Sequence, residues 1–227
     1  MITVHHLNNS RSQRVLWLLE ELGLPYEIKH YQRDPATQLA PPSLREVHPL
    51  GKSPVLTEDA LVVAESGAII EYLVERHGQG RGLVPASGTA EHLAYRYWLH
   101  FAEGSAMPPL LLKLVFDHLK HGPVPFFVKP VARVIADKML AFLVTPNLER
   151  QLGFMEQTLE RTEWFAGAAF SAADIQMSFP VEAAAQRAGL GNGGRHPRLV
   201  AYLKRIHARP AYRQALERGG PYSFARD

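Results

Sequence analysis

The stretch that decides the fold reads HPLGKSPVL and covers residues 48–56. Pro54 stands at the start of a run of β-branched and leucine residues, where a proline can open a strand without interrupting a hydrogen-bond ladder. A cis bond between Ser53 and Pro54 would turn the backbone N–H and C=O of Ser53 outward, free to pair with a peptide. Only about 5–6% of X-Pro bonds in folded proteins are cis, so the spacing alone does not establish one.

Glu65 and Ser66 follow at the point where the next predicted strand gives way to a helix. They bring together a carboxylate, a hydroxyl and the unpaired N–H groups of a helix N-terminus. This combination suits a ligand that carries both a charged amine and a carboxylate. The alternative is an ordinary helix start, with an acidic residue before an N-cap serine.

The residues before this region predict a βαβ unit. Residues 2–7 alternate loosely as a strand, and from Ser12 onward the apolar residues fall at helical spacing. These are Val15, Leu18, Leu19 and Leu22. Gly23 and Pro25 end the helix, and residues 26–31 alternate again as a second strand.

The residues after the stretch complete an α/β domain. Residues 55–57 and 61–63 flank Glu58-Asp59 as a predicted hairpin, and a helix runs from Ser66 to just before Gly78. The order βαβ and then ββα is that of a thioredoxin-like domain. We place this N-terminal α/β domain at residues 1–78.

A flexible, glycine-rich and polar segment at residues 79–88 is the predicted linker. Every periodic segment beyond it is helical, which predicts an all-α C-terminal bundle over residues 89–227. Pro108-Pro109 should kink or break the long apolar pattern at 90–120.

Prolines also divide the later helices. Pro130 and Pro146 should break the pattern at 126–162, and Pro180 should bend a helix over 171–188. Further helices are predicted around residues 199–206 and from Pro210. Within the 171–188 helix, Ser171-x-x-Asp174 is a capping box with a role in folding.

Composition excludes several classes of protein. The chain has 227 residues, is 46% hydrophobic and contains no cysteine, which removes disulfides, thiolate metal sites and a protein-thiol nucleophile. The net charge of +3 is spread without a basic block, so we expect no nucleic-acid partner. The start of the sequence does not resemble a signal peptide, and no apolar run approaches the roughly 18 residues that span a membrane. We expect a cytoplasmic protein with no membrane partner.

Four segments in order resemble the cytosolic glutathione transferases, of the bacterial-like type with a serine in the first turn. They are Ser10 to Arg14, Gly51-Lys52-Ser53-Pro54, Glu65-Ser66 and Phe170-Ser171-Ala172-Ala173-Asp174. The resemblance covers nearly the whole chain. It implies a two-domain fold, a homodimer, and glutathione as a co-substrate with no metal or organic cofactor.

Within this resemblance, Ser10 would donate a hydrogen bond to the glutathione sulfur, because Ser10 and Arg14 match the Ser-x-x-x-Arg pattern. A capping box of Ser10 with Gln13 is the alternative explanation of this serine. The same turn offers Asn8, Asn9 and Ser12, of which Asn9 is the second choice.

The resemblance also implies how the rest of glutathione is held. Ser53 and Pro54 would clamp its backbone, and Lys52 would neutralise its glycyl carboxylate. Glu65 would face the γ-glutamyl ammonium and Ser66 its carboxylate. His48 stands where many relatives carry asparagine, so no role is assigned to it.

The electrophile pocket is expected between the domains, with Met107 and Leu111 as its best candidates. Other candidate lining residues are Tyr95, Trp98, Phe101 and Phe116, although aromatic and methionine side chains at helical spacing are more often core. Glu103 and Ser105 are further candidates for reaching a bound tripeptide, across a dimer interface in one arrangement.

The function expected from the sequence is conjugation of the glutathione thiolate to hydrophobic electrophiles. Two alternatives stay open. One is glutathione-dependent reduction of disulfides or peroxides, and the other is a non-catalytic partner-binding protein of the same fold.

Overall fold

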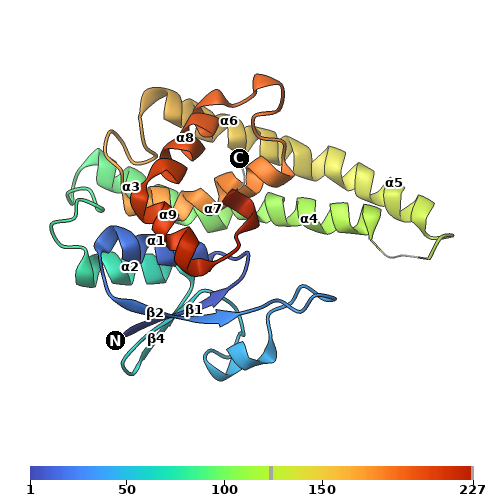
Figure 1. The fold of residues 1–227 in the computed structure, drawn as a ribbon. Coiled ribbons are helices and arrows are strands. Elements are labelled where there is room, and N and C mark those ends of the chain that lie inside the picture. Colours follow the sequence, from blue (N-terminus) through green and yellow to red (C-terminus); the bar gives the residue numbers. More distant parts are fainter. Residues whose placement is uncertain (123–124, 226–227) are drawn as a thin grey trace.

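The computed structural model describes residues 1–122 and 125–225, and its N-terminal part is built on a four-stranded sheet (Figure 1). The strands are β1 (Ile2–Leu7), β2 (Tyr26–Tyr31), β3 (Val55–Glu58) and β4 (Leu61–Ala64), in the order β2-β1-β3-β4. β1 is parallel to β2 and antiparallel to β3, and β3 is antiparallel to β4. This is the predicted thioredoxin-like arrangement.

Two helices cover one face of the sheet, α1 (Ser12–Leu22) and α2 (Ser66–His77) (Figure 1). α1 is buried on almost every side, because α2, α7 and α9 also pack against it. Its fully buried Trp17 packs edge-to-face on Tyr212 of α9. Gly23 ends α1 in the left-handed conformation, at φ 65°, as the sequence predicts. The opposite face of the sheet carries only a short 3-10 helix, Pro42–Glu46.

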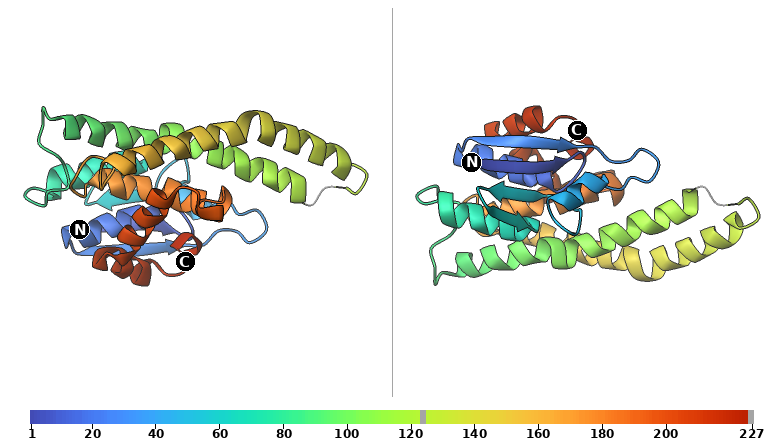
Figure 2. Two further views of the ribbon diagram at one scale, coloured as in Figure 1. Left: turned by 90° about the horizontal axis from the view of Figure 1, so that it is seen from above. Right: turned by 90° about the horizontal axis from the view of Figure 1, so that it is seen from below.

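The remainder of the described chain is helical, as predicted. Its elements are α3 (Ala90–Phe101), α4 (Met107–His121), α5 (Lys129–Met139), α6 (Thr145–Arg161), α7 (Ala172–Arg187), α8 (Pro197–Ala208) and α9 (Pro210–Gly219). α4 and α5 form a long hairpin that projects beyond the rest of the molecule in every view (Figures 1 and 2). The division into residues 1–78, 79–88 and 89–227 stays a prediction.

The expected breaks at prolines need correction. Pro108 and Pro109 lie in the first turn of α4, and a π-helical turn, Ala102–Ala106, joins α3 to α4 without a break in the helical chain. Pro146 likewise lies in the first turn of α6, directly after a second π-helical turn, Leu140–Val144. Pro130 opens α5 instead of dividing a helix. Pro130, in the first turn of α5, forfeits no intrahelical hydrogen bond. Pro108, Pro109 and Pro146 instead lie shortly after a π-helical turn, where the regular hydrogen-bond ladder of the continuous helical chain is already interrupted.

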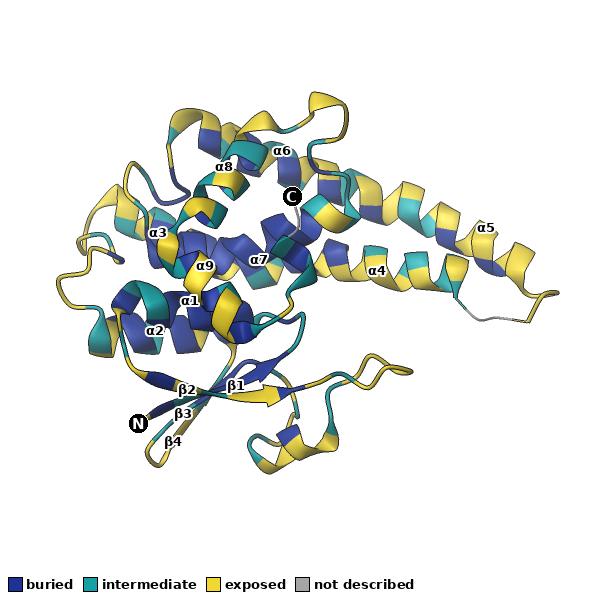
Figure 3. Cartoon of the chain, viewed as in Figure 1, coloured by how far each residue is buried: buried dark blue, intermediate teal, exposed yellow. Residues whose placement is uncertain are grey.

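α7 is the centre of the helical part, and its residues from Ala172 to Ala184 are buried (Figure 3). A helix that is enclosed on all sides needs no polar face, which explains its run of small and apolar residues. The predicted capping box at its start is confirmed: Asp174 accepts hydrogen bonds from the Ser171 N–H at 2.9 Å and the Ser171 hydroxyl at 3.1 Å. Asp174 also accepts the Phe165 N–H at 2.9 Å, which fixes the preceding loop.

The seam between the sheet domain and the helices contains a partly buried charge cluster. Glu103 lies in the first π-helical turn, and each of its two carboxylate oxygens accepts a hydrogen bond from Arg11 Nε at 3.0 Å. It also pairs with Arg14 of α1, which is 1% exposed and donates to the Gln176 carbonyl on α7 at 2.6 Å. No helix within the described residues is long and apolar enough to cross a membrane.

Candidate functional site

The strand register brings three predicted site segments to one edge of the sheet. β1 and β3 run in opposite directions, so the end of β1 meets the start of β3, where His5 pairs with Val55. Val55 in turn pairs with Ala64 at the end of β4. The turn that contains Ser10, the Ser53-Pro54 segment and Glu65-Ser66 therefore lie at the same end of the sheet.

Ser53 is fixed by its side chain and leaves its backbone free. Its hydroxyl donates to the His5 carbonyl at 2.8 Å and accepts the Leu7 N–H at 3.2 Å, which ties this segment to β1. The bond to Pro54 is cis. The Ser53 N–H and C=O make no hydrogen bond with a described residue. They are available to an extended peptide, as the sequence predicts for a cis bond.

Glu65 has an unusual backbone, with φ 72° and ψ 124°. A non-glycine residue in such a region costs of order 1–3 kcal/mol, and such residues gather at ligand clamps. The Glu65 carboxylate is exposed, while Ser66 is buried at the first turn of α2. The carboxylate, the hydroxyl and the helix N-terminus thus lie together, as predicted.

Lys52 and His48 differ in how far the structure constrains them. Lys52 is exposed, and its ammonium forms no salt bridge with any residue in the described ranges, so it remains free to meet a carboxylate. His48 accepts the Leu50 N–H at 3.4 Å, which is a local turn contact. Gly51 adopts φ +58°, and a Cβ there would lie 2.7 Å from Arg45 Cγ, so glycine is required.

The Ser10 hydroxyl belongs to a buried chain of hydrogen bonds. Ser10 Oγ lies 2.7 Å from Ser12 Oγ, and Ser12 Oγ lies 2.9 Å from His6 Nδ1. Ser10 Oγ also accepts the Ser12 N–H at 3.2 Å. The capping box considered for Ser10 and Gln13 is not formed, because the buried Gln13 amide has no hydrogen-bond partner among the described residues.

The protonation of His6 sets the direction of this chain. Burial and the neighbouring His30 lower the pKa of His6 to about 4, against the upward effect of a hydrogen bond to the Gly219 backbone. The ring is therefore neutral near pH 7 and donates to Gly219, which leaves Nδ1 to accept the Ser12 hydroxyl. Ser12 can then accept from Ser10, whose proton points inward until its hydroxyl rotates toward a ligand.

Asn9 has a structural task as well as a place beside Ser10. Its backbone is left-handed at φ 50°, and its Oδ1 accepts the Ser223 N–H at 2.7 Å and the Ser223 hydroxyl at 2.9 Å. The turn is thereby tied to the segment that follows α9. Asn9 is half-buried, whereas Ser10 is 4% exposed, so Asn9 stays the second candidate for the contact with sulfur.

The candidate electrophile residues are spread between core and surface. Met107 and Leu111 lie one turn apart on α4, with Met107 6% and Leu111 55% exposed. The remaining candidates belong mainly to the core: Tyr95, Trp98 and Phe101 are buried, and Phe116 is half-buried against it. The pocket between the domains stays a prediction.

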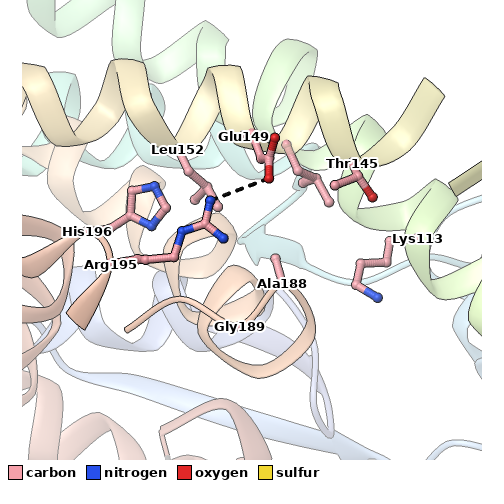
Figure 4. Close-up of a pocket in the computed structure, with 9 residues that line it drawn as sticks. Lys113, Thr145, Glu149, Leu152, Ala188, Gly189, Arg195 and His196 are labelled. Atoms are coloured by element: carbon pink, nitrogen blue, oxygen red, sulfur yellow. Dashed lines mark hydrogen bonds and ion pairs between the residues drawn. The ribbon is translucent and has the colours of Figure 1, made fainter. Parts of the chain in front are cut away.

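Two hollows lie away from the sheet edge. One, of about 560 Å³, is lined by aromatic residues of α3 and α6, and Trp98 and Phe154 stack there with ring centroids 5.3 Å apart. The other, of about 140 Å³, is lined by both polar and apolar residues, and Arg195 faces Glu149 there at 3.4 Å (Figure 4).

Glu103 is less available to a ligand than expected. Burial alone would raise its pKa, but the charges of Arg14 and Arg11 and their hydrogen bonds together hold the pKa below its usual value. The carboxylate is ionised and already paired. Ser105 uses its carbonyl to accept Gln151 Nε2 at 2.7 Å.

The sequence interpretation missed His6. On a strand with a two-residue period, His6 lies on the same face as Ile2 and Val4, which pack toward the helices. An inward-facing histidine next to a serine-rich turn is the signal that could have found it. Among the described residues, no group of three or more His, Cys, Asp or Glu side chains is placed to share a metal ion.

Comparison with known proteins agrees with this geometry. The glutathione S-transferase N-terminal domain matches residues 10–76, and the glutathione S-transferase C-terminal domain matches residues 124–210. Glutathione S-transferase 3 of Schizosaccharomyces pombe is 37% identical over 219 residues, covering 96% of this chain and 88% of that protein.

Two further relatives cover nearly the whole chain. The crystal structure of a glutathione S-transferase from Actinobacillus pleuropneumoniae has a TM-score of 0.79 and 32% identity, covering 100% of this chain and 97% of that one. The disulfide-bond oxidoreductase YfcG of Escherichia coli is 26% identical over 224 residues, covering 95% of this chain and 94% of that protein.

The fold and the sheet-edge site define a protein of the thioredoxin-like α/β class with a helical C-terminal domain. The chain belongs to the glutathione S-transferase family.

Proposed function

We propose that the protein is a glutathione transferase that conjugates the glutathione thiolate to hydrophobic electrophiles. The observation that carries this proposal is the free backbone of Ser53 at the same sheet edge as Glu65 and Ser66. The cysteinyl part of glutathione would pair with Ser53 before Pro54. Its γ-glutamyl ammonium and carboxylate would meet Glu65 and Ser66, and Lys52 would meet the glycyl carboxylate.

This placement delivers the sulfur to the turn before α1. A free thiol has a pKa of about 8.5, and each unit of lowering takes about 1.4 kcal/mol, so a mostly ionised thiolate needs roughly 3 kcal/mol. A hydrogen bond to a charged group supplies about 1.5–3 kcal/mol, and a helix N-terminus about 0.3–1 kcal/mol. Ser10, or Asn9 in its place, together with the start of α1 therefore suffices.

The chemical step is then attack of the thiolate on an electrophilic carbon. The S–C bond forms, the leaving group departs with the bonding electron pair, and the thiol proton has already passed to solvent. The protein contributes position and charge stabilisation.

Retention on immobilised glutathione, followed by turnover of 1-chloro-2,4-dinitrobenzene, tests this proposal. We expect both retention and turnover, and Ser66→Ala should weaken retention. Retention without turnover of any aryl halide would favour glutathione-dependent reduction or a non-catalytic partner-binding role. Absence of both retention and turnover would overturn the proposal.

Glutathione-dependent disulfide reduction is the second candidate. The similarity to a disulfide-bond oxidoreductase over 95% of the chain favours it, and with no cysteine in the sequence such a reaction has to use two glutathione molecules. Reduction of 2-hydroxyethyl disulfide faster than conjugation of any aryl halide would select this function. Retention with neither activity would select a non-catalytic partner-binding role.

The proposal includes a cytoplasmic homodimer. The outer faces of α3 and α6 support a dimer, because Leu93, Tyr97 and Phe154 are 71%, 47% and 43% exposed beside the aromatic hollow. Large exposed apolar side chains that gather around a hollow are typical of a protein interface.

A further inference from the structure

Two arginines from distant segments flank a pair of tilted aromatic rings beside the candidate site. Arg11, next to Ser10, lies over the Phe179 ring at 5.1 Å. Arg187, at the end of α7, lies over the Phe224 ring at the same distance of 5.1 Å. The centroids of the two rings are 5.2 Å apart and both rings are buried, so the two guanidinium groups cover one buried aromatic pair.

A third arginine approaches the same turn from the loop that follows β2. Arg33 donates to the carbonyls of Asn8 at 3.2 Å and Asn9 at 3.4 Å, directly before Ser10. A further bond from Arg33 to the Gln38 carbonyl, at 2.9 Å, holds the guanidinium in place. Arg33 is therefore fixed beside the turn by neutral partners, and its charge is not balanced by them.

The local charges leave an excess of positive charge. Glu103 faces Arg11 and Arg14, so one carboxylate serves two guanidinium groups. Arg33 and Arg187 form no salt bridge with any residue that the structure describes. Burial lowers the pKa of Arg187, and the charges of Arg11 and Arg33 lower it further. Arginine nevertheless stays protonated in proteins, so the charge persists.

Arg187 also retains its hydrogen-bonding capacity. Its guanidinium makes no hydrogen bond with another residue of the described ranges, whereas Arg11 and Arg33 spend donors on Glu103 and on backbone carbonyls. A planar guanidinium with free donors fits a carboxylate in two parallel hydrogen bonds. Arg33 and Arg11 add attraction without competing for the same oxygen atoms.

We propose that the electrophile of this enzyme bears a carboxylate, which Arg187 binds beside the turn that carries Ser10. Arg33 and Arg11 supply the remaining positive field. This inference rests on the proposed transferase function and adds the charge of the second substrate to it. It also gives a role to the two guanidinium groups beside the Ser10 turn that form no salt bridge with a described residue.

The reaction with such a substrate is balanced within the transferase step. For 4-chloro-3-nitrobenzoate, the thiolate sulfur bonds to the carbon that carries chlorine, and the C–Cl bond breaks. Chloride leaves with the electron pair, and the carboxylate is unchanged.

The test compares 4-chloro-3-nitrobenzoate with its methyl ester, each rate being divided by the uncatalysed rate with glutathione. We expect the normalised kcat/KM to favour the acid by about tenfold or more, which corresponds to about 1.4 kcal/mol. Arg187→Gln should remove this preference, and Arg187→Lys should keep part of it. Arg195→Gln, an exposed arginine on the far hollow, should leave the ratio unchanged. Equal rates for acid and ester in the unaltered protein would overturn the proposal.

A binding measurement separates failure of this inference from failure of the transferase function. The unreactive pair 4-methyl-3-nitrobenzoate and 4-methyl-3-nitrobenzamide is titrated by calorimetry into the full-length protein. The subsite would be supported if the benzoate binds more tightly than the amide and Arg187→Gln abolishes this difference. This holds even if neither 4-chloro-3-nitrobenzoate nor its methyl ester is turned over. Equal binding of benzoate and amide would assign Arg187 only to holding Phe224. Thermal unfolding of each variant shows whether it is folded.

Discussion

At the scale of single residues, the hydrogen-bond chain from Ser10 through Ser12 to His6 gives the turn its chemistry. It combines the Ser10 hydroxyl, which we propose meets the glutathione sulfur, with a neutral imidazole that fixes the direction of the protons. The serine was predictable, because a sequence motif marks it. The histidine contact was not, because it depends on how the turn folds back over β1.

Ser10→Ala should raise the pKa of bound glutathione by about 1–2 units, the equivalent of one hydrogen bond to a charged atom. The thiolate absorbance of the complex, followed during a pH titration, measures this pKa. Ser43→Ala, on the exposed 3-10 helix, is the control and should leave the pKa as it is. An unaltered pKa in Ser10→Ala would transfer the role to Asn9 or Ser12.

His6 should make the fold sensitive to acid. Its folded pKa of about 4 lies below the unfolded value of 6.5, so the unfolded state binds more protons between these values. Stability contributed by the neutral ring is therefore complete above pH 6.5 and is lost as the pH falls toward 4. Between pH 7 and pH 5 we expect a loss of about 2 kcal/mol.

Urea unfolding of the unaltered protein and of His6→Asn at both pH values isolates this effect. Asp174 acts in the opposite direction, because burial raises its pKa to about 6, but it does so equally in both proteins. The unaltered protein should lose more stability than the variant. Equal losses would show that His6 titrates normally, and an NMR titration of the His6 ring provides a direct check.

At the scale of elements, regular periodicity made most of the fold predictable. The strands, α1, α2 and the start of α7 follow from alternation, helical spacing and caps. The effect of the prolines at 108, 109 and 146 was misread because a π-helical turn before each site keeps the helical chain continuous. One π-helical turn connects α3 to α4 and the other connects α5 to α6. Such turns have no sequence signature comparable to alternation, helical spacing or caps.

The capping box of α7 should be the most sensitive helix start. Asp174→Ala removes three hydrogen bonds within a buried site and should lower the free energy of unfolding by about 2–4 kcal/mol. Asp137→Ala removes only an exposed pair with Lys120 and should change it by less than about 1 kcal/mol. Urea unfolding compares the two, and similar losses would mean that the box does not stabilise α7.

At the scale of the whole molecule, the parts that form the site come from distant positions in the sequence. Glu103 is separated by 92 residues from Arg11, and Asn9 by 214 residues from Ser223. Charge and polarity alone do not identify such partners. The meeting of Ser10, Ser53-Pro54 and Glu65-Ser66 at one sheet edge was predictable because these residues lie in short motifs, whereas the surroundings of Met107 and Leu111 depend on how the helices pack.

The proposed dimer gives a prediction at this scale. Tyr97→Asp places a charge at the aromatic hollow and should shift the protein toward monomers in sedimentation equilibrium. Leu39→Asp, at a position 66% exposed on the loop after β2, should not. If the unaltered protein is a monomer, the proposed dimer is wrong. If it is a dimer that persists in Tyr97→Asp, the outer face of α3 and α6 is not the dimer interface.

The hydrogen bonds from Ser223 to the Asn9 side chain have a practical consequence for engineering. The segment from Tyr222 to Ala225 borders the turn that carries Ser10 while contributing nothing to the sheet. A library of variants confined to it could redirect the protein toward new molecules and leave the glutathione half intact. Ser223 itself would have to be spared, because replacing it also loosens the turn that carries Ser10.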